Sequence, residues 1–281
     1  MFKTVVFKGK TEGKNILILG AVHGNETAGT RAQQEVIKEI KEAQHILKSG
    51  SVTFIPIVNE QAYNQDIRGV EDNLNRVIKF HENPKTNEEK IANQLIKEIE
   101  KADILLDLHS THCENDQPFA FIDYPTKENL DFLNIIPVQT ALAGWPDIYK
   151  NNQNIENNCT EEYAFLHQTR ALTVECGYHK SIEAVQTAKK SILNTLYQFD
   201  VLVGTVTKTE KKIITLKKFI IKEKEGKLLK NFVHLDKVKK GEPIARYETG
   251  EKVYSEVDGF IIMPNHDAKI NTEWFYIGEK S

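Results

Sequence analysis

Two histidines and one glutamate in this chain have the types and spacing of a metal site. His23 and Glu26 lie three residues apart in a glycine-rich stretch, residues 20–29, and His109 lies much further along, in residues 107–111. A catalytic zinc site commonly has three protein ligands of these types and one position open to water. The sequence therefore predicts one Zn²⁺ per chain, held by His23, Glu26 and His109. Polar side chains that only hydrogen-bond locally are the alternative for a motif this short.

Glu175 is a candidate for proton transfer beside the metal. It follows an apolar run, residues 171–174, where a carboxylate is costly to bury unless it is paired or has a function. Such a group can take a proton from attacking water and pass it to a leaving amine. A salt bridge at the sheet edge is the alternative. Cys176 is adjacent, but no further histidine stands in an obviously partnered position, so a cysteine nucleophile is not favoured. Asp107 could orient a ligand imidazole or cap the next loop.

A polar loop, residues 66–76, carries the groups that could bind a substrate. It contains Arg68, Asn73, Asn75 and Arg76. An arginine can clamp a carboxylate or stabilise a developing oxyanion. On residue type alone, a solvated charged loop is the simpler interpretation.

The flanking patterns show how these residues could meet. Apolar runs at residues 4–7, 15–19, 51–58, 103–108, 119–122, 136–138 and 171–174 predict strands. Helical periods at 30–47, 87–102, 126–133, 159–167 and 181–199 alternate with them. This order predicts an α/β fold with the sheet flanked by helices on both faces. The predicted metal ligands then follow the carboxyl ends of two strands, where open α/β sheets bind ligands. A long irregular segment, residues 59–86, is typical of a functional loop.

The pattern changes near residue 200. Short β-rich runs at 213–216, 219–222, 232–234, 243–247, 253–254, 259–263 and 274–277 are separated by glycines. They predict a smaller all-β domain. We therefore expect a catalytic α/β domain in residues 1–200 and a β-rich domain in residues 201–281.

Composition excludes several classes of protein. The chain has 281 residues, a formal net charge of -3 and three cysteines. A slightly acidic chain offers no electrostatic case for a nucleic-acid partner. No apolar run approaches the roughly 20 residues that span a bilayer, so no membrane association is expected. The N-terminus lacks a signal-peptide pattern, and an odd cysteine count gives no disulfide framework, which predicts a cytoplasmic protein.

Together, residues 20–29, Arg68 with residues 73–76, residues 107–111 and residues 174–177 resemble the succinylglutamate desuccinylase/aspartoacylase family, which has a zinc carboxypeptidase-like fold. The resemblance covers roughly residues 15–180. It implies a mixed sheet flanked by helices, and a C-terminal all-β domain that roofs the active site. The implied roles are zinc binding by His23, Glu26 and His109, acid–base catalysis by Glu175, polarisation of the scissile carbonyl by Arg68, and substrate-carboxylate binding by Asn75 and Arg76.

The chain also departs from that family. Aspartoacylases use a further arginine before the catalytic glutamate, and the nearest candidate, Arg170, is not at the matching position, which puts N-acetylaspartate in doubt. The roofing domain usually contributes a tyrosine, for which Tyr247, Tyr254 and Tyr276 are all candidates. The segment around Lys252 resembles a lipoyl-type hairpin, but an extra residue in the turn argues against a carrier lysine.

These features favour a zinc-dependent amidohydrolase that cleaves a small N-acyl amino acid to a carboxylate and a free amino acid. A metallocarboxypeptidase acting on short peptides would use the same zinc ligands. A non-catalytic small-molecule binding protein on the same fold is less favoured, because a binder needs no base facing the metal. The acyl group, the amino acid and homo-oligomer formation are left open by the sequence.

Overall fold

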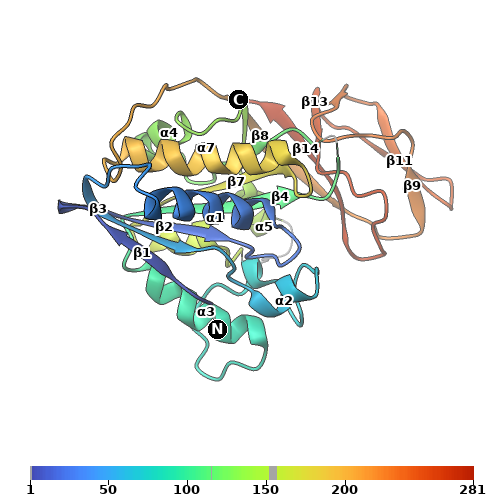
Figure 1. Ribbon diagram of the computed structural model, residues 1–281. Helices are drawn as coiled ribbons and strands as arrows, with labels where there is room; N and C mark the ends of the chain where they lie inside the picture. Colours follow the sequence, from blue (N-terminus) through green and yellow to red (C-terminus); the bar gives the residue numbers. More distant parts are fainter. Residues whose placement is uncertain (1, 115, 152–156) are drawn as a thin grey trace. The chain divides into compact units, whose positions relative to one another are not determined.

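A computed structural model describes residues 2–114, 116–151 and 157–281 (Figure 1). The chain forms two compact units. Unit 1 consists of Met1–Thr140 and Glu156–Lys211, and unit 2 of Ala141–Ile155 and Lys212–Ser281. Unit 2 therefore takes one segment from the middle of the chain as well as the C-terminal part.

Unit 1 is built on a mixed sheet. Its strand order is β1 (Val5–Lys8), β3 (Ser49–Ile55), β2 (Thr11–Gly20), β4 (Ile104–Thr111), β7 (Arg170–Tyr178) and β5 (Phe119–Phe121). The central strands β3, β2, β4 and β7 are parallel, while β1 and β5 pair antiparallel at the two sides. The predicted α/β fold with a mixed sheet is thus confirmed.

Helices cover both faces of this sheet. On one face, α1 (Ala28–Lys41) and α7 (Ile182–Gln198) lie side by side (Figure 1). On the other, α3 (Asn87–Ile99) and α6 (Thr160–Leu166) pack on Leu17, Leu19 and Leu105. Side chains alternate between faces along a strand. Asp107 and His109 therefore point to the same face as Leu105, where α6 lies.

The long loop between β3 and α3 contains short helical turns. These are α2 (Glu60–Asn64) and a 3₁₀ turn, η1 (Leu74–Arg76). A further helix, α4 (Lys127–Leu133), follows β5. The start of α3 has a capping box, in which the Thr86 hydroxyl accepts from the backbone of Glu89 and the Glu89 side chain accepts from the backbone of Thr86.

Unit 2 is mostly β. Its larger sheet runs β6 (Thr140–Ala143), β8 (Lys212–Ile221), β14 (Glu273–Lys280), β13 (Gly259–Ile262) and β10 (Lys237–Val238). A second sheet consists of β12 (Lys252–Tyr254), β11 (Pro243–Tyr247) and β9 (Gly226–Leu228). Helix α5 (Trp145–Asn151) also belongs to this unit, and Trp274 and Phe275 lie in its core.

Some local predictions were wrong. Residues 136–138 form a turn rather than a strand, because Pro137 has no N–H for a ladder, and the strand comes later, as β6. Residues 232–234 are not a strand, and β10 lies beyond them. Helix α1 ends at Lys41 rather than near residue 47. The runs 213–216 and 219–222 are one continuous strand, β8.

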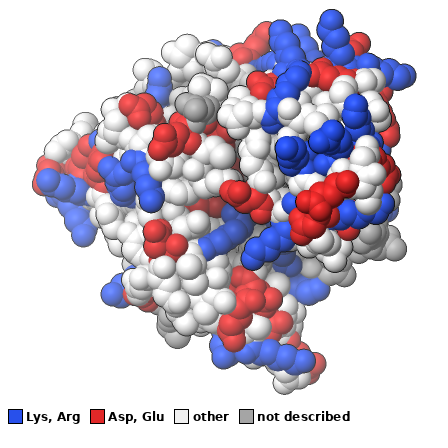
Figure 2. All heavy atoms as spheres, turned by 90° about the vertical axis from the view of Figure 1, so that its right-hand side faces the viewer, with Lys and Arg blue, Asp and Glu red and all other residues white. Residues whose placement is uncertain are grey.

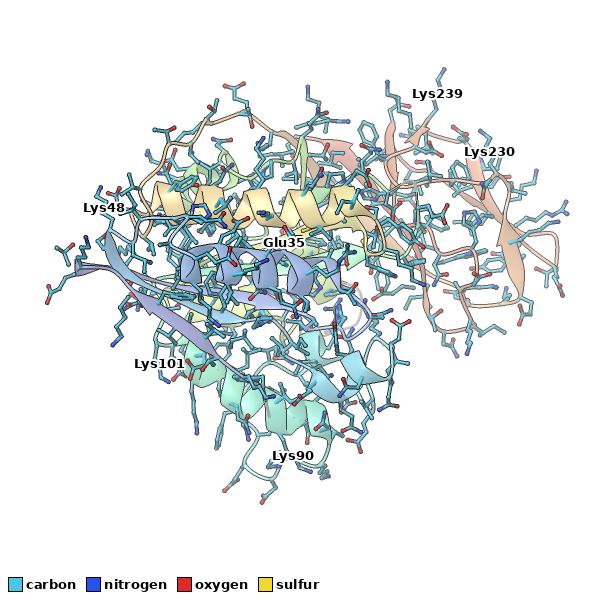
Figure 3. All side chains as sticks on the ribbon, in the orientation of Figure 1. Glu35, Lys48, Lys90, Lys101, Lys230 and Lys239 are labelled. Carbon is cyan, nitrogen blue, oxygen red and sulfur yellow. The ribbon has the colours of Figure 1, made fainter. Side chains whose placement is uncertain are left out.

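Charged side chains are scattered among uncharged ones on the surface of the protein. Basic and acidic groups are interspersed on the face shown in Figure 2, in keeping with the small net charge of -3. In Figure 3 the labelled Lys48, Lys90 and Lys239 extend outward from the ribbon, while Glu35 on α1 pairs with Lys189 on α7 at 3.1 Å. Within the described residues, no helix combines the length and the apolar character needed to cross a membrane.

Candidate metal centre

The connection from β2 to α1 carries His23 and Glu26. Ala21, at the end of β2, has a left-handed φ of 46°, which is uncommon for a residue with a side chain and turns the chain sharply. The three glycines of residues 20–29 pack closely against protein, so that no side chain would fit at Gly20, Gly24 or Gly29 without a shift of its neighbours. A Cβ on Gly24 would lie 2.2 Å from the carbonyl carbon of Ala62, and one on Gly29 would lie 2.7 Å from the Leu108 Cβ.

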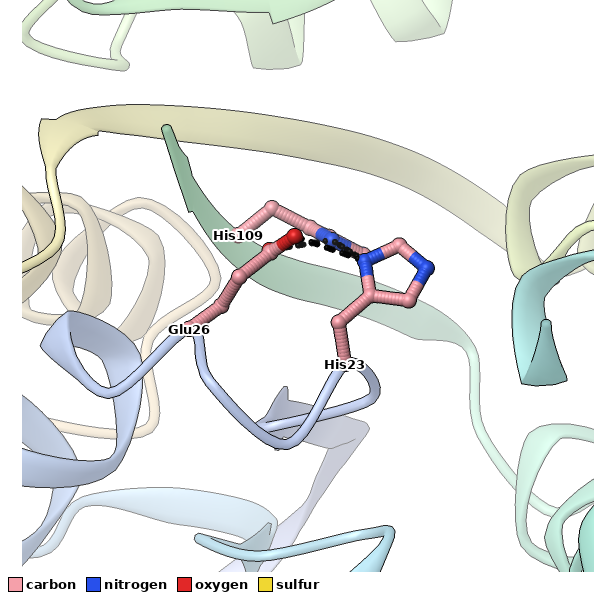
Figure 4. Close-up of side chains that lie close together, drawn as sticks. All are labelled: His23, Glu26 and His109. Atoms are coloured by element: carbon pink, nitrogen blue, oxygen red, sulfur yellow. Dashed lines mark hydrogen bonds and ion pairs between the residues drawn. The ribbon is translucent and has the colours of Figure 1, made fainter. Parts of the chain in front are cut away.

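The structure brings His23, Glu26 and His109 together (Figure 4). Their candidate ligand atoms all lie within 4.8 Å of one another, and all three side chains are buried. Glu26 Oε1 lies 2.8 Å from His23 Nδ1, and Glu26 Oε2 lies 2.8 Å from His109 Nδ1. The two Nδ1 atoms are only 3.1 Å apart. If both Nδ1 atoms carried only lone pairs, they would repel each other at this distance. A cation bound between them and the carboxylate would remove that repulsion.

The outer nitrogens of both histidines also face polar side chains, His23 Nε2 through a hydrogen bond and His109 Nε2 through a close charged contact without hydrogen-bond geometry. His23 Nε2 donates to Asn73 Oδ1 at 3.0 Å, which leaves Nδ1 as the nitrogen facing the centre. His109 Nε2 lies 3.1 Å from the carboxylate oxygen Oδ2 of Asp107. Outer partners of this kind fix the ring orientation and tautomer of metal-binding histidines. The residues present therefore fit a metal ion. Asp107 lies beside the His109 ring, as expected if it orients a ligand imidazole rather than capping the next loop.

The electrostatics of the centre also favour a cation. Burial would raise the pKa of Glu26, but His23 and His109 hold it well below its usual value. Burial would lower the pKa of His109, but the carboxylates of Asp107 and Glu26 raise it well above its usual value. For His23, burial and the charge of Arg68 lower the pKa to about 4. The centre thus places two buried carboxylates, those of Asp107 and Glu26, around His109, an arrangement that would stabilise a bound cation.

Glu175 lies on β7 directly opposite His109 on β4, so both side chains point to the same face of the sheet. It is buried, and its Oε2 has no hydrogen-bond partner among the described residues. Burial, and repulsion from Glu26, raise the pKa of Glu175 to about 8. A carboxyl group with that pKa can both accept and donate a proton near neutral pH.

Arg68 also reaches the centre. Its Nη1 donates to Glu26 Oε1 at 2.9 Å, while about half of its side chain stays exposed (54%). Its backbone carbonyl accepts from the N–H of Gly24 at 3.2 Å, which ties the loop to the ligand-bearing turn.

Asn75 and Arg76 lie in η1 on the same loop. Asn75 is buried, and its Oδ1 accepts the backbone N–H of Thr160 at 3.0 Å. Arg76 is half-buried, and its Nη1 donates to the carbonyl of Asn75 at 2.8 Å. Both residues are linked to His23 through Asn73. The Asn73 side-chain oxygen, which faces His23 Nε2, also accepts the N–H of Asn75 at 3.0 Å, and the Asn73 carbonyl accepts the N–H of Arg76 at 2.9 Å.

Other residues considered in the sequence lie elsewhere. Arg170 is at the amino end of β7, opposite Ile104, whereas Glu175 is near the carboxyl end. Cys176 is buried, and burial raises the pKa of its thiol well above the usual value, which disfavours a nucleophilic role. Within unit 2, Tyr247 and Tyr276 are buried in its packed interior and Tyr254 is about half exposed.

Sequence reasoning did not assign the residues that hold the site in place. Asn73 was seen only as part of a polar loop, and Thr160 and Glu88 were not singled out. One usable signal for Glu88 was its place in the first turn of the helix predicted at residues 87–102, next to the capping box. Thr160 contacts Asp107 across 53 residues, and no local pattern predicts such a contact.

Comparison with known proteins addresses the family directly. The family model described as "Succinylglutamate desuccinylase/Aspartoacylase catalytic domain" matches residues 12–191. The chain belongs to this family. It is a family of deacylases, and the matched segment contains the candidate metal ligands and Glu175. None of the curated proteins compared with the chain matches it.

Solved structures of related proteins share the fold. A succinylglutamate desuccinylase/aspartoacylase from Rhodobacter sphaeroides is 18% identical, with a TM-score of 0.79 over 100% of this chain and 90% of that chain. The product-bound ectoine utilization protein EutE (DoeB) from Ruegeria pomeroyi is 22% identical, with a TM-score of 0.79 over 98% and 88%. A succinylglutamate desuccinylase from Vibrio parahaemolyticus is 20% identical, with a TM-score of 0.75 over 96% and 82%. At these identities the likeness shows the fold.

Proposed function

We propose that this protein is a zinc-dependent amidohydrolase that cleaves the amide bond of a small N-acyl amino acid. The observation that carries the proposal is the buried cluster of His23, Glu26 and His109, with Glu175 in register beside it. A bound Zn²⁺ would polarise the substrate carbonyl and acidify water. The donor set of two imidazoles and one carboxylate is one that zinc accepts.

The chain's own residues divide the remaining chemistry. Glu175 takes a proton from the attacking water and delivers it to the leaving amine, which becomes the free amino acid. Arg68 stabilises the negative charge that develops on the carbonyl oxygen. Asn75 and Arg76 hold the substrate carboxylate and so orient the amide bond.

A metallocarboxypeptidase acting on short peptides is the second candidate, since it would need the same metal ligands and base. We further propose, from the family resemblance, that the C-terminal β-rich part restricts the site to small substrates. Parallel assays with N-acetyl and N-succinyl amino acids and with short peptides distinguish the two. Release of amine from peptides alone would favour the carboxypeptidase.

The proposal predicts separate effects of two substitutions. His23→Ala should lose zinc, measured by elemental analysis of the purified protein, while the control His45→Ala should retain it. Glu175→Gln should keep zinc and lose turnover by a factor of about 10² or more, because it removes only the proton carrier. Full zinc occupancy in His23→Ala, or wild-type turnover in Glu175→Gln, would contradict these assignments.

A further inference from the structure

The first residue of α6 contacts both halves of the site. Thr160 is fully buried, at 0% exposure. Its hydroxyl donates to Asp107 Oδ2 at 2.6 Å, and its backbone N–H donates to Asn75 Oδ1 at 3.0 Å. One residue thus bonds the carboxylate behind a candidate metal ligand and the amide of a candidate substrate-binding residue.

The hydrogen bond donated by the Thr160 hydroxyl affects the candidate metal ligand His109. Asp107 is fully buried, and the atom that accepts from Thr160 is the same Oδ2 that lies 3.1 Å from His109 Nε2. The other oxygen, Oδ1, has no hydrogen-bond partner among the described residues. The Thr160 hydroxyl therefore fixes which oxygen of Asp107 faces the imidazole, and through it the direction of His109 Nδ1. Without the Thr160 hydroxyl, the buried Asp107 carboxylate would keep only its close contact with His109 Nε2, and turning to find another donor would become favourable.

The hydrogen bond donated by the Thr160 backbone N–H affects the candidate substrate-binding residue Asn75. A side-chain amide has one accepting oxygen and one donating nitrogen, and it can present either in a given direction. Because the Thr160 N–H needs an acceptor, it holds the Asn75 oxygen toward α6 and leaves the NH₂ group as the donor for a carboxylate. An amide flipped by 180° would present an oxygen to the substrate and repel it.

We propose that Thr160 is a positioning residue that sets the orientation of His109 through Asp107 and of Asn75 through its own N–H. The inference rests on the proposed function for the roles of His109 and Asn75. On this proposal, the first residue of α6 holds both the metal ligand His109 and the substrate-binding amide of Asn75 in their working orientations.

Three substitutions separate the two contacts. Thr160→Ser keeps the hydroxyl and the N–H. Thr160→Val has nearly the same shape and removes only the hydroxyl. Thr160→Pro removes both, and proline suits this position because it is the first residue of the helix and the preceding Cys159 has an extended backbone, with φ -97° and ψ 170°. Thr195→Val is a matched control, since Thr195 is also fully buried but its hydroxyl donates to the carbonyl of Ser191 within α7.

The readouts are the zinc dissociation constant, from competition with a chromophoric chelator, and KM and kcat on an active N-acyl amino acid. Thr160→Val should weaken zinc binding by about tenfold, which is the lower end of the effect of removing a group that orients a metal ligand. Its KM should stay close to that of the wild-type protein. Thr160→Pro should weaken zinc binding equally and also raise KM by about fivefold, the effect of one lost hydrogen bond. Thr160→Ser and Thr195→Val should match wild type in both constants.

Two outcomes would overturn the inference while leaving the proposed function intact. One is wild-type zinc affinity in Thr160→Val when the wild-type protein binds zinc and hydrolyses the substrate. The other is an equal loss of zinc affinity in Thr160→Val and Thr195→Val, which would reduce the effect to general destabilisation. Failure of the wild-type protein itself to bind zinc would overturn both the inference and the proposed function.

Discussion

At the scale of residues, the contact between Arg68 and Glu26 needs a functional interpretation. Arg68 Nη1 lies 2.9 Å from Glu26 Oε1, so the guanidinium shares the carboxylate that we assign to the metal. Its half-exposed side chain nevertheless leaves it accessible to a substrate from the solvent side. Arg76 is oriented differently, because its Nη1 is held by the carbonyl of Asn75. Substitution of the two arginines should therefore affect different kinetic constants.

We expect Arg76→Lys to raise KM with little change in kcat. Lysine keeps the charge but loses the bidentate geometry that suits a carboxylate, and binding lost equally from ground and transition states appears in KM. Arg68→Ala should instead lower kcat by about 10² or more, because charge develops on the carbonyl oxygen only in the transition state. Steady-state kinetics of both variants on one N-acyl amino acid measure this, with the exposed Arg31→Ala as a control. An unchanged KM in Arg76→Lys together with a change in KM alone in Arg68→Ala would require the roles to be exchanged.

At the scale of elements, the loop that carries these arginines is organised around a buried carboxylate. Glu88, in the first turn of α3, is fully buried. Its carboxylate accepts from Asn59 Nδ2 at 3.0 Å and from the consecutive backbone N–H groups of Val70, Glu71 and Asp72 at 2.8, 3.3 and 3.4 Å. Burial would raise the pKa of Glu88, but these donors hold it below the usual value. The loop is thus wrapped around one charge supplied by the helix.

Glu88→Gln should destabilise the protein by about 1–3 kcal/mol, because an amide NH₂ would face backbone donors that need an acceptor. It should also raise KM, since Asn75 and Arg76 follow directly from the wrapped segment. Thermal unfolding and kinetics measure the two effects. The neighbouring Glu89→Gln is a matched control, because glutamine also serves in a capping box. Equal behaviour of the two variants would show that the Glu88 carboxylate does not organise the loop.

The same elements show what the sequence could predict. Strands β2, β4 and β7 contain continuous apolar runs, and helices α3 and α7 have clear helical hydrophobic periods. The alternation of these two patterns was enough to predict the fold class. His23, Glu26 and His109 could be grouped because they follow strand ends, which topology brings together. Asn73, Glu88 and Thr160 could not be assigned, because each acts through hydrogen bonds to distant backbone or side chains. The α5 helix was missed because it is short: the apolar residues Trp145, Ile148 and Tyr149 have helical spacing but span little more than one turn.

At the scale of the whole molecule, the division of the chain is discontinuous. Unit 2 is made from Ala141–Ile155 and Lys212–Ser281, so its α5 segment depends on strands far along the sequence. Trp145 and Tyr149 are buried at 6% and 1% exposure. The ring of Trp145 lies 4.6 Å from that of Tyr276 in β14, and the Tyr149 hydroxyl donates to Glu273 at 3.1 Å. Residues on α5 thus complete the core of the C-terminal unit.

A chain ending at Lys211 should therefore expose the apolar face of α5 and self-associate. The aromatic side chains of Trp145 and Tyr149 would lose their partners in β14, and large exposed apolar patches promote association. Binding of a hydrophobic dye and light scattering, compared with the full-length chain, measure this. Full-length Trp145→Ala is the companion variant, expected to lose about 3–5 kcal/mol of stability because it leaves a cavity in the same core. If the shortened chain stays monomeric and binds no more dye than the full-length protein, Trp145 and Tyr149 do not depend on the C-terminal strands for their burial.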